Sequence, residues 1–503
     1  MKRLFALLLI VCLLTGCGDE GAYVPTGGGF QEDGNTSSSQ AQTQVQGELR
    51  LSYNQDGSFH PYTATDLNNR SLLSLIYQGL FAMNDDYEVT PILCRSYKVS
   101  TDMREWTFYL ENATFSDGQA LTAQDVVASL RAANASGFYE GRLRHIKSIW
   151  AGNDGSVVIS LNTPMGNLPL LLDIPIVKAS QVNGTKPLGT GPYMLEDTPN
   201  GKQLRRQPAW WCSAALPISA QIIPLDHGTT QRELWDLYKF SGMSMVVTDA
   251  YVDFRGDYEL WESENGQFLY LSCNIKRPVF SNKTVRSALT HAIDRDTLVK
   301  KYFRGFAHSA TLPASPSFPH YSTALAEKYA YAPDKFSQAV TDANMAGQTV
   351  VLLVNREDPL RLRTAQAIAE MLTAAGLVVT IPEFTGQDYL NCLKWGEFDL
   401  FLGQTKLSPN MDLTAFFSED GALNYGSLTH VAANAMSLEA LADSGNYQSL
   451  HKLVMDDGRL CPILVRSDAV YGRRGNFPGL SPARDNIFYY SLGKTLADIR
   501  ITE

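Results

Sequence analysis

Residues 349–381 constrain the fold more than any other segment of this chain. Residues 349–354 and 377–381 are apolar runs rich in β-branched side chains, and Gly376 precedes the second run. Between them, one helix face is formed by Ala365, Ile368, Ala369 and Leu372. A strand–helix–strand unit places its two strands parallel in one sheet, with a right-handed crossover. The sequence therefore predicts an α/β fold for the second half of the chain.

The first half of the chain is richer in strand and hairpin patterns. Residues 47–53 alternate between apolar and polar side chains, and residues 106–110 form another strand pattern. An Asp-Gly dipeptide at 154–155 separates the segments IKSIWAG at 146–152 and SVVISL at 156–161, which is typical of a β-hairpin. A chain of 503 residues exceeds what one hydrophobic core usually serves, so we expect two lobes.

Three segments carry helix signals. Thr122 and the aspartate three residues later match a capping box, so a helix is predicted to begin there. Residues 71–81 show helical apolar spacing that ends near Gly79. Residues 285–293 carry a further helical stripe, and Asp294 is placed to cap the helix that follows it.

The N-terminal residues have the pattern of a targeting segment. A basic pair precedes the apolar run 4–14, which is shorter than the roughly 20 residues of a membrane-spanning helix. This pattern predicts a secretory signal peptide over residues 1–16. The tetrad Leu-Thr-Gly-Cys at 14–17 resembles the bacterial lipobox, which implies that Cys17 is lipidated and that residues 17–46 form an anchor and flexible tether. A plain secretory peptide with an accidental cysteine is the alternative.

These features predict a lipoprotein on the outer face of the cell membrane, or on the periplasmic side if the host has two membranes. No later run approaches 18 apolar residues, so the sequence does not predict a channel or permease. The net charge is −10, and an acidic chain is a poor partner for phosphate backbones. We therefore expect no nucleic-acid binding.

The sequence carries no recognised catalytic or metal-binding motif. No two of the seven cysteines have C-x-x-C spacing, and the eight histidines form no i, i+4 pair. Residues 189–194 begin like a dinucleotide fingerprint, but the third glycine is missing and Pro192 would disturb the helix start, so a rigid turn is the better interpretation. We expect no enzyme activity, no cofactor and no metal, and we expect the scattered cysteines to be small buried residues.

Several blocks of the chain resemble, in order, the family 5 extracellular solute-binding proteins of ABC importers, which include oligopeptide-, dipeptide- and nickel-binding proteins. The strongest is WTFYLENATFSDGQALTAQDVVASL at 106–130. The other blocks are SLLSLIYQGLF at 71–81, PLGTGPY at 187–193, FLYLSCN at 268–274 with VRSALTHAIDRDTLV at 285–299, the unit at 349–381, and GEFDLFLG at 396–403. The resemblance extends over essentially all of residues 47–503.

This resemblance implies an α/β, two-lobed periplasmic-binding-protein-like (Venus flytrap) fold of the large class with a discontinuous lobe I. Lobe I would comprise residues 47–270 and 471–503, with an inserted subdomain at about 76–175, and lobe II residues 271–470. A small solute would bind between the lobes and favour their closed form. The closed protein, expected to be a monomer, would then dock on an ABC permease in the membrane.

The identity of the solute is less constrained than the fold. Peptide-binding members of the family commonly carry a Gly-Trp-x-x-Asp-like stretch whose acid neutralises the peptide amine. Starting from Gly403, this chain has Gln404 in the Trp position and Leu407 in the Asp position, which removes a charge-assisted partner for an ammonium group. Lys406 would favour an anion if it faces the cleft, and Asp412 would replace the acid after a loop shift. Peptide is the leading ligand, with nickel, haem and anionic solutes as alternatives.

Ligands of α/β lobes bind beyond the carboxyl ends of strands. On this ground Tyr53, Asn54, Asn274, Arg356 and Tyr425 join Gln404, Lys406 and Asp412 as candidate ligand-binding residues. Two hypotheses from other functional classes stay open: a sensor or adaptor that signals the presence of a ligand without uptake, and a surface hydrolase.

Overall fold

The computed structural model describes residues 49–139, 141–212, 216, 218–248, 257–494 and 496–501. All of them belong to the second of the two units into which the chain divides, Ala41–Glu503. The predicted signal peptide, Cys17 and the predicted tether lie outside the described residues. Within the described ranges, no helix has the length and apolar character needed to cross a membrane.

The first lobe is built on small sheets. In the sheet with order β1-β10-β9-β8, β1 is parallel to β10 and the other neighbours are antiparallel. A second sheet with order β4-β5-β7-β6 is antiparallel, and β2 pairs with β3. The strands are β1 (Leu51–Asn54), β2 (Phe81–Met83), β3 (Val89–Pro91), β4 (Cys94–Val99), β5 (Glu105–Leu110), β6 (Ile146–Ala151), β7 (Val157–Leu161), β8 (Tyr193–Thr198), β9 (Gly201–Arg206) and β10 (Ile222–Gly228). The helices are α1 (Leu67–Ile76), α2 (Ala123–Asn134), η1 (Leu168–Leu171), η2 (Ala179–Gln181), α3 (Gln231–Phe240) and α14 (Leu496–Ile499).

A seven-stranded mixed sheet begins beside the first lobe and forms the centre of the second. Its order is β11-β17-β12-β16-β14-β15, and β13 also pairs with β17. The strands are β11 (Met245–Thr248), β12 (Glu259–Cys273), β13 (Ala307–Ser309), β14 (Thr349–Val354), β15 (Val378–Thr380), β16 (Leu400–Lys406) and β17 (Leu460–Gly472). The helices around it are α4 (Pro278–Ser281), α5 (Lys283–Ala288), η3 (Leu289–Ala292), α6 (Arg295–Tyr302), α7 (Thr323–Ala326), η4 (Glu327–Tyr329), α8 (Pro333–Asp342), α9 (Pro359–Ala374), α10 (Gly386–Trp395), α11 (Thr414–Phe417), α12 (Val431–Ala442), η5 (Ser444–Asn446) and α13 (Tyr447–Asp457).

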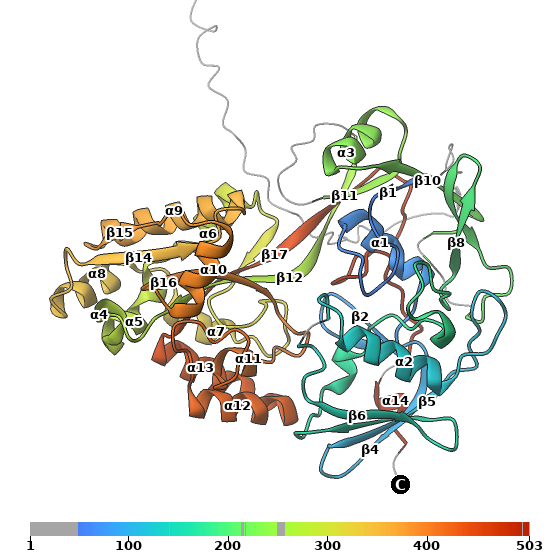
Figure 1. The fold of residues 1–503 in the computed structure, drawn as a ribbon, viewed down its shortest axis with the longest axis horizontal. Coiled ribbons are helices and arrows are strands. Elements are labelled where there is room, and N and C mark those ends of the chain that lie inside the picture. Colours follow the sequence, from blue (N-terminus) through green and yellow to red (C-terminus); the bar gives the residue numbers. More distant parts are fainter. Residues whose placement is uncertain are drawn as a thin grey trace, which may run out of the picture. The chain divides into compact units, whose positions relative to one another are not determined.

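Two long antiparallel strands, β12 and β17, connect the lobes (Figure 1). In β12, Trp261 packs against the core of the first lobe, whereas Leu269 belongs to the core of the second. In β17, Leu464 belongs to the second core and Val470 to the first. The chain therefore crosses twice between the lobes, which agrees with the predicted two-lobed fold with a discontinuous first lobe. The domain boundaries at 270/271 and 470/471 stay predictions.

Several local predictions are confirmed because short-range chemistry decides them. Asp125 Oδ2 accepts hydrogen bonds from the Thr122 amide at 2.9 Å and the Thr122 hydroxyl at 2.6 Å, so the capping box forms at the start of α2. The Asp-Gly dipeptide turns the antiparallel pair β6–β7. β14, α9 and β15 form the predicted unit with parallel strands, and Asp294 caps α6.

The helix predicted over residues 71–81 is shifted in the structure, where α1 covers Leu67–Ile76. It begins early because the Asp66 side chain accepts hydrogen bonds from the amides of Asn68 and Asn69. It ends before Gly79 because the PLGTGPY segment packs against its last turn. A Cβ atom on Gly191 would lie 2.5 Å from the Ile76 carbonyl carbon, so this glycine permits a close backbone approach. This packing agrees with a rigid turn at 189–194.

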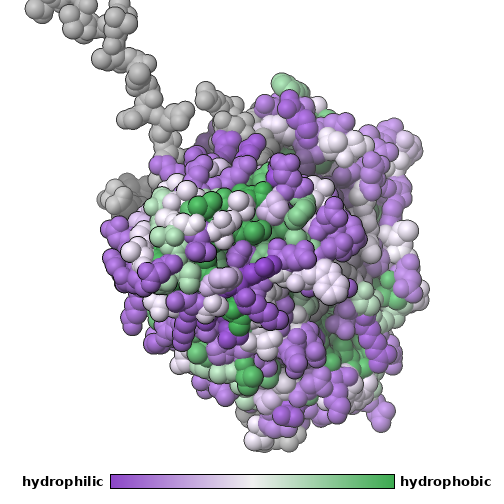
Figure 2. Space-filling view, turned by 60° about the vertical axis from the view of Figure 1, so that its left-hand side comes forward, coloured by the Kyte–Doolittle hydropathy of each residue, from purple (hydrophilic) through white to green (hydrophobic). Residues whose placement is uncertain are grey.

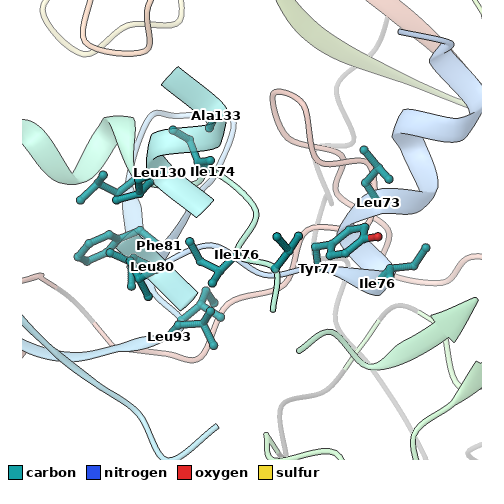
Figure 3. Packing of buried hydrophobic residues seen from close by; sticks show 14 of the residues in the cluster. Leu73, Ile76, Tyr77, Leu80, Phe81, Leu93, Leu130, Ala133, Ile174 and Ile176 are labelled. Carbon is teal, nitrogen blue, oxygen red and sulfur yellow. The ribbon is translucent and has the colours of Figure 1, made fainter. Parts of the chain in front are cut away.

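In the first-lobe core, side chains of α2 and β2 pack together with those of the loop that contains Ile174 and Ile176 (Figure 3). Phe81 is 1% exposed, and its ring meets that of Phe108 edge-on with centroids 6.0 Å apart. Leu130 of α2 and Ile174 are fully buried in the same cluster. Four of the five described cysteines are buried, which confirms the expectation for those four; Cys212 is partly exposed.

Candidate functional site

Two cavities lie where the lobes meet. The larger, of about 410 Å³, is lined by second-lobe residues between 405 and 425 and by six first-lobe residues: Gly137, Phe138, Gly141, Arg142, Arg144 and Arg484. The smaller, of about 270 Å³, lies between α1 and the strands β12, β16 and β17. Phe138 and Lys406 line both cavities. A site at this position is built by both lobes.

Lys406, the last residue of β16, is the centre of this region. Its Nζ lies 4.3 Å from the centroid of the Phe138 ring, and the guanidinium carbon of Arg70 lies 3.3 Å from the same centroid. Lys406 Nζ is 2.6 Å from Asp485 Oδ1, and Arg70 Nη2 is 3.5 Å from that same oxygen. Two cations thus share one carboxylate and one aromatic ring.

Two further arginines approach the larger cavity from the first lobe. Arg484 is 2% exposed; its Nη2 donates to the Leu407 carbonyl, and its Nη1 donates to the Tyr87 hydroxyl at 3.3 Å. Both acceptors are neutral, and no described carboxylate forms an ion pair with Arg484. Arg142 pairs with Asp173, and burial lowers the pKa of this arginine to about 10.

The crowding of cations changes the protonation of Lys406. Burial, reinforced by the neighbouring Arg70 and Arg484, lowers the pKa of Lys406 to about 7 in spite of its contact with Asp485. The same cations hold the pKa of Asp485 far below its ordinary value, although burial acts in the opposite direction. Lys406 and Arg70 therefore share the carboxylate of Asp485, and Arg484 adds to the positive potential around it.

A second group of polar contacts joins the lobes through Asp412. Its Oδ2 lies 2.9 Å from His145 Nε2 and 3.5 Å from Arg144 Nε. Its Oδ1 accepts hydrogen bonds from the Thr414 amide at 2.8 Å and hydroxyl at 2.7 Å. Burial would raise the pKa of Asp412, but His145 and Arg144 outweigh it and hold that pKa at about 2. We call Asp412, Thr414, Arg144 and His145 the interlobe latch.

Four of the predicted ligand-binding residues lie on these cavities. Gln404 and Lys406 line the smaller one, and Lys406, Asp412 and Tyr425 line the larger. Gln404 Nε2 donates to Gln267 at 3.3 Å, whereas its Oε1 is buried without a hydrogen-bond partner. Leu407, which stands in the Asp position of the family stretch, is 3% exposed and packs in an apolar cluster.

The other four predicted residues lie away from the two interlobe cavities. Tyr53 is 3% exposed and packs beside Phe59, and the Asn54 side chain donates to Asp66 at 2.9 Å. Asn274 donates to the carbonyls of Gly396 and Phe398. Arg356 lies 3.7 Å from the carboxylate of Glu383 on the second lobe. Their contacts in the structure are with neighbouring protein groups.

Sequence reasoning missed several residues that line the cavities: Arg70, Phe138, Arg142, Arg144, Arg466, Asp468, Arg484 and Asp485. The loop after α2 had a usable signal, since Arg142 and Arg144 alternate with apolar residues just beyond a predicted helix. Arg484 and Asp485 follow the return of the chain to the first lobe, and no local pattern indicates that they face residue 406.

A third cavity, of about 740 Å³, opens on the second lobe and is lined by Asn274, Tyr425 and the end of α10. Its rim includes Trp395, which is 70% exposed, and Leu390, which is 52% exposed. Figure 2 turns this lobe forward and shows hydrophobic residues gathered within a mainly hydrophilic face. Within the described part of the chain, no group of three or more His, Cys, Asp or Glu side chains is placed to hold a metal ion.

Comparison with known proteins shows one family across most of the chain. The family described as bacterial extracellular solute-binding proteins, family 5 Middle, matches residues 88–422. The glutathione-binding protein GsiB of Salmonella typhi is 28% identical over 279 residues, which cover 52% of this chain and 54% of GsiB. The chain spans about half the length of the curated relatives it matches.

Solved structures match over a larger part of the chain. The ABC transporter substrate binding protein CtaP of Listeria monocytogenes superposes with a TM-score of 0.71 at 17% identity, covering 91% of this chain and 99% of CtaP. The oligopeptide-binding protein AppA of Bacillus subtilis, in complex with a nonapeptide, gives a TM-score of 0.61 at 18% identity, covering 85% and 94%. These likenesses confirm the predicted two-lobed fold.

Proposed function

Because this chain belongs to the bacterial extracellular solute-binding proteins of family 5, we propose that it is the substrate-binding component of an ABC importer. It captures a peptide or related small solute between its lobes, and its closed form docks on a membrane permease as a monomer. The observation that carries the proposal is the pair of cavities lined by side chains of both lobes. Such a site is complete only when the lobes are closed, so binding and closure are coupled.

The size of the site and the names of relatives support a small peptide as the solute. A cavity of about 410 Å³ lies within the range that encloses small ligands. GsiB is a glutathione-binding protein, and AppA of Bacillus subtilis is an oligopeptide-binding protein. Other neighbours hold a nickel–histidine complex or agropinic acid, so the ligand screen has to include metals and non-peptide solutes.

Isothermal titration of the purified full-length chain with defined di-, tri- and tetrapeptide pools tests the proposal. We expect saturable 1:1 binding by at least one pool. At 100 times its Kd, the bound solute adds about 2.7 kcal/mol to the free energy of unfolding, which appears as a raised melting temperature. The solute should be recovered unchanged, because we propose a binding protein and not an enzyme. If no peptide, metal or sugar pool shows measurable binding, the proposal is contradicted.

Deletion of the gene separates the importer from a sensor or adaptor. An importer predicts that uptake of the bound solute is lost in the deletion strain. A sensor predicts unchanged uptake and loss of a transcriptional response to that solute.

We propose further that Cys17 carries the lipid that holds the protein at the outer face of the membrane. The lipobox-like tetrad at 14–17 supports this placement. Cells grown with radiolabelled palmitate should yield labelled protein, and Cys17→Ser should abolish the label. Cys12→Ser is the matched control, since Cys12 lies within the predicted signal peptide and its loss should leave the label intact. Equal labelling of Cys17→Ser and the unsubstituted chain would show that the anchor lies elsewhere or is absent.

A further inference from the structure

We propose that the larger interlobe cavity selects small peptides of net negative charge, with a solute carboxylate bound by Lys406, Arg142 and Arg484. This inference rests on the proposed function and narrows its substrate class. It follows from the charges that line the cavity and from the contacts that already occupy the carboxylate of Asp412 on its wall.

The lining of this cavity is strongly unbalanced in charge. Among the residues that the structure describes, Asp412 is the one carboxylate that lines it, whereas the basic residues on its wall are Arg142, Arg144, Lys406 and Arg484. Asp173 and Asp485 offset part of this charge from outside the lining, but Asp485 is shared between Lys406 and Arg70. Arg484 donates to neutral acceptors, the Leu407 carbonyl and the Tyr87 hydroxyl. Burial would lower its pKa, but Tyr87 and the nearby carboxylates of Asp485 and Glu264, which form no ion pair with it, outweigh burial and raise that pKa. The buried Arg484 guanidinium makes no ion pair with a described carboxylate, so a solute carboxylate that reaches it adds a charge-assisted contact.

The described carboxylate on this wall, Asp412, is not free to accept the ammonium group of a peptide. Asp412 is 8% exposed, and both of its oxygens already bind partners. These partners are Arg144, His145 and the amide and hydroxyl of Thr414. Leu407 stands where peptide-binding relatives commonly place an acid, and its side chain is buried among apolar residues. A cationic solute therefore finds no free described carboxylate to pair with, and the basic residues of the wall repel it.

The apolar residues of the wall favour a solute that carries apolar groups beside its carboxylate. Phe138, Phe416, Leu423 and Tyr425 line the same cavity as the basic residues. Aromatic and aliphatic walls bury side chains and methylene groups of a ligand, whereas a few polar groups orient it. A short peptide with one acidic and one apolar side chain combines both features better than a small inorganic anion does.

The protonation of Lys406 provides an independent readout. Its pKa is lowered to about 7, and the charged groups that face it are Asp485, Arg70, Arg484 and Asp468. An anion beside Lys406 raises that pKa, so the bound state takes up a proton above pH 7. Affinity for an acidic peptide should therefore fall as pH rises from 7 to 9, by at most about tenfold for each pH unit. Asp468, whose pKa is raised to about 6 by burial, is already ionised over this range.

The experiment is a titration calorimetry panel of tripeptides that differ at one position, which carries Glu, its isostere Gln, or Lys. Inorganic phosphate and a simple dicarboxylate serve as non-peptide anions. We expect the Glu peptide to bind at least about tenfold more tightly than its Gln counterpart, and the Lys peptide to bind more weakly than both. Phosphate and the dicarboxylate should bind more weakly than the Glu peptide, since they lack the apolar part.

Variants of the full chain connect the preference to the site. Lys406→Gln should reduce the Glu-over-Gln preference and remove the pH dependence between 7 and 9. Lys394→Gln is the matched control, because Lys394 lines the third cavity, on the second lobe. Its loss should change neither the Glu-over-Gln preference nor the pH dependence. Lys406→Arg keeps the charge and should keep the preference, which separates loss of charge from a folding defect.

The outcomes distinguish this inference from the proposed function. If Gln or Lys peptides bind as tightly as Glu peptides, the inference is overturned while solute binding stands. The same follows if Lys406→Gln retains the full preference and pH dependence. If no peptide of the panel or of the wider pools binds, both the inference and the proposed function are overturned.

Discussion

Replacing Arg295 with Met is expected to lower the free energy of unfolding by about 3–5 kcal/mol. Arg295 is 4% exposed at the start of α6. Its Nη2 donates to the Pro462 carbonyl and the Thr290 hydroxyl, both at 2.8 Å, and its Nε donates to the Ala310 carbonyl at 3.1 Å. One guanidinium thus joins η3, the segment after β13, and β17. Met fills part of the volume but leaves these buried acceptors without a donor.

Urea unfolding followed by circular dichroism measures this effect. Arg363→Met is the matched control in the same lobe, since Arg363 is exposed on α9 and its replacement should change stability by less than about 0.5 kcal/mol. Arg295→Lys, which keeps one cationic donor group, should fall between the two. Equal unfolding midpoints for Arg295→Met and Arg363→Met would show that the Arg295 hydrogen bonds contribute nothing net.

Asp412→Asn is expected to weaken solute binding by about 10- to 100-fold, because it removes the anion of the interlobe latch. A charge-assisted hydrogen bond with His145 and an ion pair with Arg144 join the lobes through Asp412, so we expect these contacts to favour the closed form. Their loss lowers the closed population, and apparent affinity falls by the same factor. The pKa of Asp412 is about 2, below its ordinary value, so the contribution of this carboxylate is present above about pH 4 and is lost as pH falls through 2.

Calorimetry with the best-binding peptide, combined with X-ray scattering of the unliganded protein, measures affinity and closure together. Asp456→Asn is the matched control, since Asp456 pairs with Lys452 on the same helix of the second lobe and spans no lobe interface. A double-mutant cycle with His145→Gln should give a coupling of about 1 kcal/mol or more across the lobes. If Asp412→Asn loses stability but keeps full affinity, Asp412 only orders its own loop through Thr414.

The parts of the fold that local chemistry decides could be predicted from the sequence. Thr122 and Asp125 lie three residues apart and cap each other whatever the rest of the chain does. The strand–helix–strand unit at 349–381 likewise carries its own apolar periodicity. The end of α1 could not be placed in this way, because Gly191, more than a hundred residues later, packs against Ile76.

The candidate site was predicted only in part for the same reason. Lys406 and Asp412 are predicted as ligand-binding residues because they lie in a stretch that resembles a known family. Their partners come from the other lobe. Asp485, which pairs with Lys406, lies 79 residues away in the sequence, and His145, which pairs with Asp412, lies 267 residues away. Tyr53 is predicted from its place at the end of a strand; in the structure its ring is buried and packs beside Phe59.

Native mass spectrometry of the full-length chain, purified without denaturant and then incubated with an acidic peptide pool, tests the central claim most directly. The account predicts one small solute per chain, released intact on unfolding and enriched in peptides of net negative charge. It also predicts that Asp412→Asn retains less of this solute than Asp456→Asn does. A chain that carries no solute as purified and gains none from the peptide, metal or sugar pools would contradict the account.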